Sequence, residues 1–209
     1  MALSTPTKLR AAERHLTKVD PRLAAVIRRA GKCELKTTRD FEPFAALTSS
    51  ICHQQLNGKA AATILGRLKE RVGKGDWPPP RQVKAARMTS LRACGLSRAK
   101  SLALKDLAAK VLDGTVPSAK QLHLLDEETI ITRLTEVRGV GRWTAQMLLM
   151  FSLGRLDVLP VGDFGVRKGF TMLHKKRAMV SEEDLLAHGE RWRPYRSVAA
   201  WYLWRVVDS

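Results

Sequence analysis

Cysteine is scarce in this chain, and its spacing excludes the common metal and redox sites. Only Cys33, Cys52 and Cys94 occur among 209 residues. They form no CxxC pair and no Cys/His cluster with the spacing of a zinc site, and an iron–sulfur cluster requires four cysteine ligands. We therefore expect three reduced, largely buried thiols and no iron–sulfur cluster.

Long hydrophobic runs are also missing. No apolar stretch approaches the roughly 20 residues needed to span a bilayer. Residues 1–20 contain no continuous apolar segment of the kind found in a signal peptide. The sequence thus predicts that the protein is neither secreted nor bound to a membrane. Apolar residues still make up 44% of the chain, which is enough for a folded core.

Acidic residues are few compared with basic ones. The 37 Lys and Arg residues outnumber the 20 Asp and Glu residues, which gives a net charge of +17. The basic residues recur along the whole chain rather than in a tail. Such an excess favours a polyanionic partner, nucleic acid before an acidic membrane surface. The alternative is a surface that is charged for solubility.

Alternation typical of strands is absent, whereas helical periodicity recurs throughout. Residues 20–31 have Asp20 as a helix cap, Pro21 at the first helical position and Gly31 as a stop. The stretch GDWPPP at 75–80 is the clearest break. The pattern predicts an all-α protein of roughly nine to twelve short helices. Further helix starts are predicted at Asn57 and Ser97.

The stretch VRGVGRWT at 137–144 joins two predicted helices through two glycines. Gly139 and Gly141 permit left-handed backbone conformations and leave the turn bare, so the free amides of the next helix face outward. Such a helix N-terminus favours a phosphate, and Arg142 and Thr144 lie beside it. A plain αα-hairpin also uses glycine and is the alternative. The net charge favours phosphate binding.

A lone aspartate ends the stretch LPVGD at 159–163. Asp163 stands between a loop and a predicted helix. Most aspartates at such positions cap the helix. Taken alone, the position therefore leaves two readings open, a helix cap and a functional carboxylate.

Six ordered segments of the chain resemble the helix–hairpin–helix DNA glycosylase superfamily, and most closely its 3-methyladenine DNA glycosylase II, or AlkA-type, branch. The segments are DPRLAAVIRRAG, QQLNGKAAATI, ACGLSRAKSLALKDLA, GVGRWTAQMLL, LPVGDFGVRKGF and RWRPYRSVAAWYLWR. The resemblance implies an all-α fold of two lobes around a cleft, without the N-terminal β domain of larger members. One lobe would be residues 43–155, and the other residues 1–42 with 156–209. The chain departs from the family at Arg138, where many members carry proline.

The resemblance also implies that Asp163 is the catalytic carboxylate. Cleavage of an N-glycosidic bond builds positive charge on the deoxyribose, which a fixed carboxylate stabilises while it orients or deprotonates water. Arg167 and the helix N-terminus would favour the ionised carboxylate. Relatives that also cut the strand carry a lysine two residues after the second hairpin glycine, where this chain has Trp143. We therefore expect a monofunctional glycosylase that leaves an abasic site.

A base that has left the duplex needs a flat apolar pocket. The resemblance places Trp143 and Trp204 in its wall, with Phe164 as a further candidate and Trp201 and Tyr202 as looser ones. An indole face attracts a cationic base by roughly 0.5–2 kcal/mol, which favours alkylated purines such as 3-methyladenine and 7-methylguanine. The alternative is that the closely spaced aromatic residues near the C-terminus belong to the core.

The loop HQQLNGK at 53–59, here called the wedge loop, matches the family segment that fills the gap left by the flipped base. Gln55 is favoured by its position and Leu56 by its chemistry, and Gln54 is the third candidate. A solvated loop is the alternative. Phosphate contacts are predicted nearby for Lys59, Arg98 and Lys100.

The implied activity requires no cofactor. Family hairpins often hold a monovalent cation, Na⁺ or K⁺, through main-chain carbonyls, which here are those of Thr135, Val137 and Val140. The implied partner is double-stranded DNA with alkylated bases, bound by a monomer in the bacterial cytoplasm (the nucleoid) or in a nucleus. Two alternatives stay open: a non-enzymatic helix–hairpin–helix DNA-binding protein, and a glycosylase for deaminated or other damaged bases.

Overall fold

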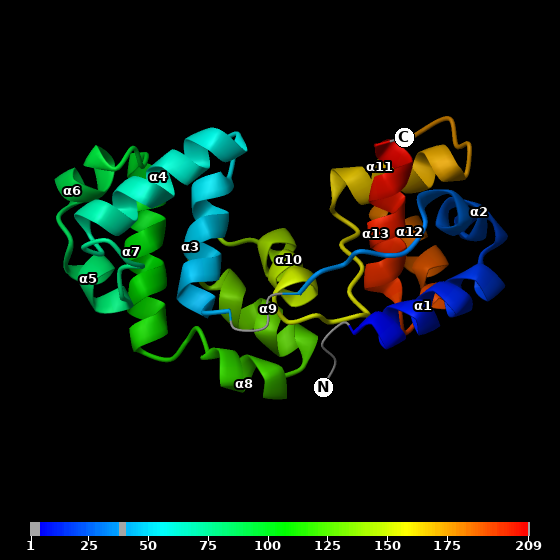
Figure 1. The fold of residues 1–209 in the computed structure, drawn as a ribbon, viewed down its shortest axis with the longest axis horizontal. Coiled ribbons are helices and arrows are strands. Elements are labelled where there is room, and N and C mark those ends of the chain that lie inside the picture. Colours follow the sequence, from blue (N-terminus) through cyan, green and yellow to red (C-terminus); the bar gives the residue numbers. More distant parts are fainter. Residues whose placement is uncertain (1–4, 38–40, 209) are drawn as a thin grey trace. The chain divides into compact units, whose positions relative to one another are not determined.

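The computed structural model describes residues 5–37 and 41–208. Within these ranges the chain forms thirteen α-helices, one 3-10 helix and no β-strand, which confirms the all-α class (Figure 1). The number of helices exceeds the predicted nine to twelve because several of them are very short. Ala86 and Arg87, for example, have extended ψ angles of 139° and 145° and separate α5 (Pro80–Ala85) from α6 (Met88–Ala93). None of the helices in the described ranges is long and apolar enough to cross a bilayer.

Contacts divide the chain into two compact units. The central unit is Asp40–Leu148, and the terminal unit combines Met1–Arg39 with Leu149–Ser209. The division falls inside α10 (Arg142–Phe151), so the glycine hairpin belongs to the central unit and Asp163 to the terminal unit. The cleft expected between two lobes stays a prediction.

The central unit is built around α7. This helix contacts α3, α5 and α6, and α3 also contacts α4 (Figure 1). The predicted caps are confirmed, because the side chains of Ser97 and Asn57 accept hydrogen bonds from backbone amides at the starts of α7 and α4. Leu104 and Leu107 form the fully buried face of α7. Besides α5, α6 and part of α10, the unit contains α3 (Pro43–His53), α4 (Gly58–Arg71), α7 (Arg98–Leu112), α8 (Ala119–Leu124) and α9 (Glu127–Thr135).

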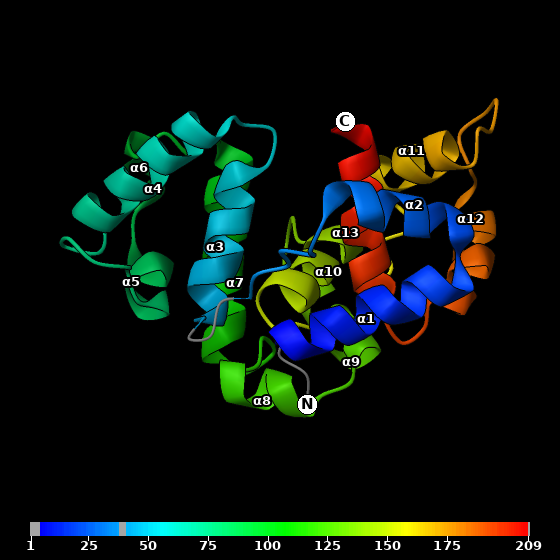
Figure 2. The same ribbon diagram turned by 45° about the vertical axis from the view of Figure 1, so that its right-hand side comes forward.

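The terminal unit is built around α13, drawn in red, which packs against α1, α2 and α11 (Figures 1 and 2). Asp20 caps α2 and Pro21 opens it, as predicted, and Gly31 ends it with a φ of 76°. The side chain of Leu203, on α13, is fully buried. The helices of the unit are α1 (Pro6–Val19), α2 (Pro21–Ala30), α11 (Phe164–Leu173), α12 (Glu182–Gly189), the 3-10 helix η1 (Glu190–Trp192) and α13 (Arg196–Val207).

The backbones of α11 and α13 approach each other closely in the terminal unit. A Cβ atom built on Gly169 of α11 would lie 2.0 Å from the carbonyl oxygen of Leu203 on α13. Any side chain at position 169 would therefore hold the two helices further apart. The same helix, α11, begins directly after Asp163, which caps it.

All three cysteines are free and buried, as predicted. Burial raises the pKa of the Cys33 thiol to about 12 and that of the Cys52 thiol to about 11. Thiols with such pKa values stay protonated at neutral pH and are poor nucleophiles. Cys52, which lies next to the wedge loop, is therefore a packing residue.

Candidate active site

Asp163 is held in one orientation at the start of α11. Its Oδ1 atom accepts a hydrogen bond from the amide of Val166 at 2.7 Å and one from the indole Nε1 of Trp204 at 2.9 Å. The first bond makes Asp163 the cap of α11, so the capping reading is correct. The second bond comes from α13 and fixes the carboxylate beside an aromatic ring. Capping and a chemical role are thus compatible for the same side chain.

Trp204 belongs to an aromatic pair at the surface of the terminal unit. Its ring stacks on Phe151, with 6.0 Å between the ring centroids and 23° between the ring planes. Phe151 is 37% exposed, and Phe164, next to Asp163 in the chain, is 68% exposed. The predicted residues Asp163, Trp204 and Phe164 therefore lie in one unit, together with Phe151. Phe151 was not among the predicted site residues because it ends an apolar segment that is typical of a buried helix.

The remaining aromatic residues of α13 have other partners. Tyr202 is fully buried, and its hydroxyl donates to the carbonyl of Gly31 at 2.8 Å and to Glu13 Oε1 at 3.1 Å. The ring of Trp201 lies under the guanidinium of Arg205, 5.1 Å from its centroid. Tyr202, a looser candidate for the base pocket, is thus a core residue.

Two polar residues at the start of α13 hold the loop that precedes Asp163. The Ser197 hydroxyl accepts from the amide of Val158 at 2.9 Å. Buried Arg196 donates through Nε to Asp157 Oδ1 and through Nη2 to the carbonyl of Asp157, both at 2.8 Å. Neither residue was among the predicted site residues. A signal was present, because an arginine and a serine that begin an otherwise apolar helix need buried partners.

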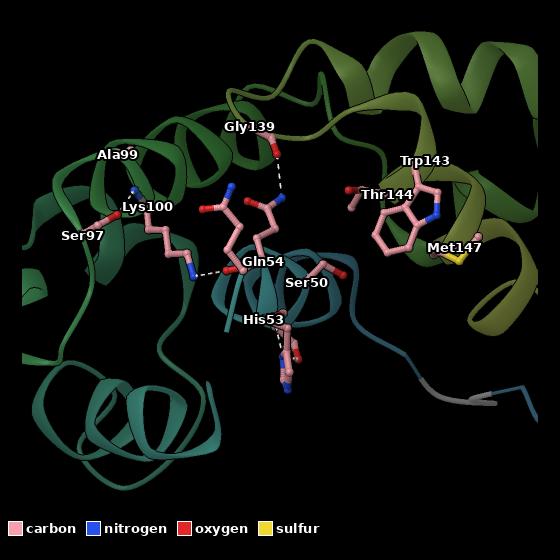
Figure 3. Close-up of a pocket in the computed structure, with 12 residues that line it drawn as sticks. Ser50, His53, Gln54, Ser97, Ala99, Lys100, Gly139, Trp143, Thr144 and Met147 are labelled. Atoms are coloured by element: carbon pink, nitrogen blue, oxygen red, sulfur yellow. Dashed lines mark hydrogen bonds between the residues drawn. The ribbon is translucent and has the colours of Figure 1, made fainter. Parts of the chain in front are cut away.

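A pocket of about 830 Å³ lies in the central unit, between the end of α3, the start of α7 and the start of α10. Figure 3 shows Gln54 and Lys100 on one side of it, and Trp143 and Met147 from α10 on the other. Trp143 is 49% exposed. The pocket thus brings together several residues that the sequence singled out: Gln54, Gln55, Lys100, Gly139, Trp143 and Thr144.

Three hydrogen bonds tie the start of the wedge loop to its surroundings. The side-chain Nε2 of Gln54 donates to the carbonyl of Gly139 in the hairpin at 2.8 Å (Figure 3). Lys100 Nζ donates to the carbonyls of Cys52 and Gln54, each at 2.8 Å. The side chain of Lys100, predicted to contact a phosphate, therefore holds the end of α3 against α7.

The tip of the wedge loop projects Gln55 and Leu56 into solvent. Gln55 has a φ of 56°, a left-handed conformation that costs a residue other than glycine about 1–3 kcal/mol. Leu56 is 40% exposed, whereas Gln54 is half-buried and bonded to the hairpin. Gln55 and Leu56 thus fit the wedge role better than Gln54 does.

The two hairpin glycines serve different purposes. Gly139 has a φ of 79°, the left-handed conformation that was predicted. The same prediction is wrong for Gly141, which has no positive φ and around which a Cβ atom would meet nothing within 4 Å. Gly141 instead leaves a bare surface where α10 begins.

The cationic side chains near the hairpin differ in the contacts that they make. Arg142 donates to Glu128 Oε2 at 3.0 Å and to Oε1 at 2.5 Å, and this hydrogen bonding raises the pKa of Arg142. Both side chains are exposed, so the pair is weak. Lys59 and Arg98 are exposed near the starts of α4 and α7.

Arg167 was expected to support the ionised form of Asp163. In the structure its guanidinium bonds to the segment before α12. It donates to the carbonyl of Val180 through Nε at 3.0 Å and through Nη2 at 2.7 Å. Glu182 lies 3.9 Å from its Nη1. Arg167 thereby links α11 to the segment before α12. Its side chain makes these contacts because it extends away from the start of α11 towards α12.

The sequence profile of the HhH-GPD superfamily of base excision DNA repair proteins matches residues 48–194, which include the wedge loop, the hairpin and Asp163. The chain belongs to this superfamily. DNA-3-methyladenine glycosylase 1 of Schizosaccharomyces pombe is 36% identical over 96% of this chain and 88% of its own length. The predicted membership of the helix–hairpin–helix glycosylases is thus confirmed.

Two solved structures of HhH-GPD relatives resemble the fold closely. The Schizosaccharomyces pombe 3-methyladenine DNA glycosylase in complex with abasic DNA has a TM-score of 0.80 and 35% identity, and the match covers 93% of this chain and 95% of the other. A DNA-3-methyladenine glycosidase from Bacillus halodurans has a TM-score of 0.82 and 37% identity, with 97% and 88% covered.

Proposed function

We propose that this HhH-GPD protein is a monofunctional DNA glycosylase that acts in base excision repair. It removes alkylated purines such as 3-methyladenine and 7-methylguanine and leaves an abasic site. One observation carries the proposal: the Asp163 carboxylate accepts a hydrogen bond from the half-buried indole of Trp204, which stacks on the exposed ring of Phe151. The relatives' names support the substrate class, since they are DNA-3-methyladenine glycosylases.

The role of Asp163 follows from the charge that the reaction creates. As the N-glycosidic bond lengthens, the deoxyribose becomes electron-poor and the departing base takes the bonding electrons. A carboxylate already fixed by two hydrogen bonds stabilises this charge without reorganising during the reaction. The same carboxylate orients or deprotonates the water that attacks the sugar.

The aromatic residues explain a preference for alkylated purines. A purine methylated at N3 or N7 is cationic, so it leaves the sugar without being protonated first. It is also attracted to the face of an indole by roughly 0.5–2 kcal/mol. Trp204 and Phe164 in the terminal unit are the proposed contacts of the flipped base. Selectivity would rest on charge and shape rather than on hydrogen bonds.

DNA would bind through the hairpin and the exposed basic side chains. The bare start of α10 at Gly141 offers backbone amides to a phosphate, and Thr144 lies one turn further along the helix. Arg142 would exchange Glu128 for a phosphate. Gln55 or Leu56 would enter the gap left by the flipped base. The net charge of +17 favours binding of the polyanionic DNA backbone.

We also propose a monovalent cation at the hairpin. The carbonyl of Val137 accepts a hydrogen bond from the amide of Val140 at 3.0 Å, and its second lone pair is suited to a cation. The carbonyls of Thr135, Val137 and Val140 would hold Na⁺ or K⁺, which would add positive charge where a phosphate binds.

The experiment that tests the function is base release from DNA treated with a methylating agent. We expect free 3-methyladenine and 7-methylguanine, identified by chromatography, and abasic sites in an otherwise uncut strand. Borohydride should trap no covalent adduct, because Trp143 occupies the position of the lyase lysine. Tight DNA binding without base release would instead indicate a non-enzymatic DNA-binding protein. Release from a parallel substrate with deaminated or oxidised bases, but not from methylated DNA, would indicate another glycosylase.

Gly165 permits the contact between Trp204 and Asp163. A Cβ atom at position 165 would lie 2.8 Å from Trp204 Cδ1 and 3.0 Å from its Nε1. We expect Gly165→Ala to displace the indole and break its bond to the carboxylate, which should lower kcat for base release about tenfold. Gly162→Ala is the matched control, because its Cβ would lie at an ordinary 3.7 Å from Glu182. Equal activity in the two variants would contradict the role of Trp204.

A further inference from the structure

A second polar cluster lies in the terminal unit, at the opposite end of α11 from Asp163. It consists of Asp20 between α1 and α2, His174 directly after α11, and His188 on α12. Each residue offers one ligand atom, and the three atoms lie within 4.8 Å of one another. The ten residues of α11 place about 15 Å of helix between this cluster and Asp163. The proposed glycosylase chemistry does not use it.

Two members of the cluster contact each other, and the third has a ring nitrogen without a partner. His188 Nε2 lies 3.1 Å from Asp20 Oδ2. The Nε2 atom of His174 is buried and has no hydrogen-bond partner among the residues that the structure describes. Buried polar atoms of native proteins are rarely left in this state. A ligand that accepts electron pairs from nitrogen would satisfy this atom.

We propose that Asp20, His174 and His188 bind a divalent transition-metal ion, Zn²⁺ by preference. Two imidazole nitrogens and one carboxylate oxygen suit Zn²⁺, with water as the fourth ligand. Tetrahedral bonds of about 2.0–2.2 Å place ligand atoms about 3.3–3.6 Å apart. The 3.1 Å between His188 Nε2 and Asp20 Oδ2 is a little shorter than this range, so a small separation of these two side chains would admit the metal.

The third ligand can reach the metal at little cost. The ligand atoms of the cluster are at most 4.8 Å apart, so a shift of the His174 ring by about 1.5 Å closes the site. The buried Nε2 atom would lose no hydrogen bond in this shift. Stacking of the ring on Phe170, at 4.0 Å between centroids, already limits its orientation.

Asp20 has the outer hydrogen bonds that support a metal-binding carboxylate. Trp192 Nε1 donates to Oδ2 at 2.9 Å, and two backbone amides at the start of α2 donate to Oδ1 at 3.1 and 3.0 Å. The residue is buried. The two amide bonds are the cap of α2, and together with the indole bond they fix the orientation of the carboxylate, as the outer hydrogen bonds of a metal-binding carboxylate do. A metal here would join the α1–α2 junction to α11 and α12, and so stabilise the unit that carries Asp163.

The test measures metal binding by the full chain after treatment with a chelator. His174→Gln is the informative variant, and His123→Gln, in the central unit, is the matched control because each removes one of five histidines. The wild type and the control should bind one equivalent of Zn²⁺ by calorimetry and give the visible absorption of tetrahedral Co²⁺. At a Zn²⁺ concentration 100-fold above Kd, their Tm should rise by roughly 5–10 °C.

His174→Gln should lose the Co²⁺ absorption and the rise in Tm. His188→Gln should lose the same signals, so the test does not depend on one substitution. Failure of the wild type to bind one equivalent would overturn the proposal, and so would unchanged binding by His174→Gln. None of these measurements uses DNA, so their outcome is independent of the glycosylase activity.

Discussion

Asp163→Asn should lower the rate of methylated-purine release by about 100- to 1,000-fold while the protein stays folded. Asparagine keeps an oxygen that accepts from the amide of Val166 and the indole of Trp204, and it caps helices as well as aspartate does. The substitution therefore removes only the negative charge that faces the electron-poor sugar. Single-turnover release from methylated DNA measures the loss directly.

A matched control separates the charge of Asp163 from its capping. Asp126 caps α9 in the same manner, accepting from the amide of Thr129 at 2.9 Å, and it lies in the central unit. Asp126→Asn should retain full activity. Circular dichroism and DNA binding should be unchanged in both variants. Release by Asp163→Asn within a few-fold of the wild type would remove the carboxylate from the mechanism.

Gly169→Ala should destabilise the protein by more than about 3 kcal/mol, the upper end of the usual cost of overpacking. The new methyl group would lie 2.0 Å from the carbonyl oxygen of Leu203 and 2.8 Å from its carbon. Both atoms belong to the backbone of α13, so no side chain can move aside. The two helices must separate, which opens the core of the terminal unit. Urea unfolding should show the loss as a lower midpoint.

The control for this prediction is Gly66→Ala in the middle of α4. A Cβ atom there would meet nothing within 4 Å, and alanine in a helix is more favourable than glycine by about 1 kcal/mol. Gly66→Ala should therefore be neutral or stabilising. If Gly169→Ala unfolds at the same urea concentration as the wild type, the close approach of α11 and α13 is not required for stability.

The two glycines of α11 both allow close contact with α13. Gly165 and Gly169 are four residues apart and so lie on the same face of the helix. They meet the neighbouring residues Trp204 and Leu203 of α13. Gly169 lets the helices approach, and Gly165 lets the indole reach Asp163. The stability of the protein and the orientation of the candidate catalytic carboxylate, Asp163, therefore depend on the same pair of helices.

Much of the helical architecture could be predicted from residues that are neighbours in the chain. Asp20, Asn57 and Ser97 cap the helices they were expected to cap, and Gly139 has the expected left-handed backbone. These features depend on hydrogen bonds and backbone preferences that span at most four residues. The resemblance to the helix–hairpin–helix glycosylases is also visible in the sequence, because each of the segments that carry it is short and continuous in the chain.

Only the tertiary structure decided which side chains form contacts and which residues are their partners. Lys100 holds the carbonyl of Gln54, and Phe151 joins Trp204 beside Asp163. The partners in these contacts are separated by 46 and 53 positions in the sequence, respectively. Local pattern cannot reveal them, because a lysine or a phenylalanine suits many surroundings equally well. The choice among those surroundings is made by the packing of helices that are distant in sequence.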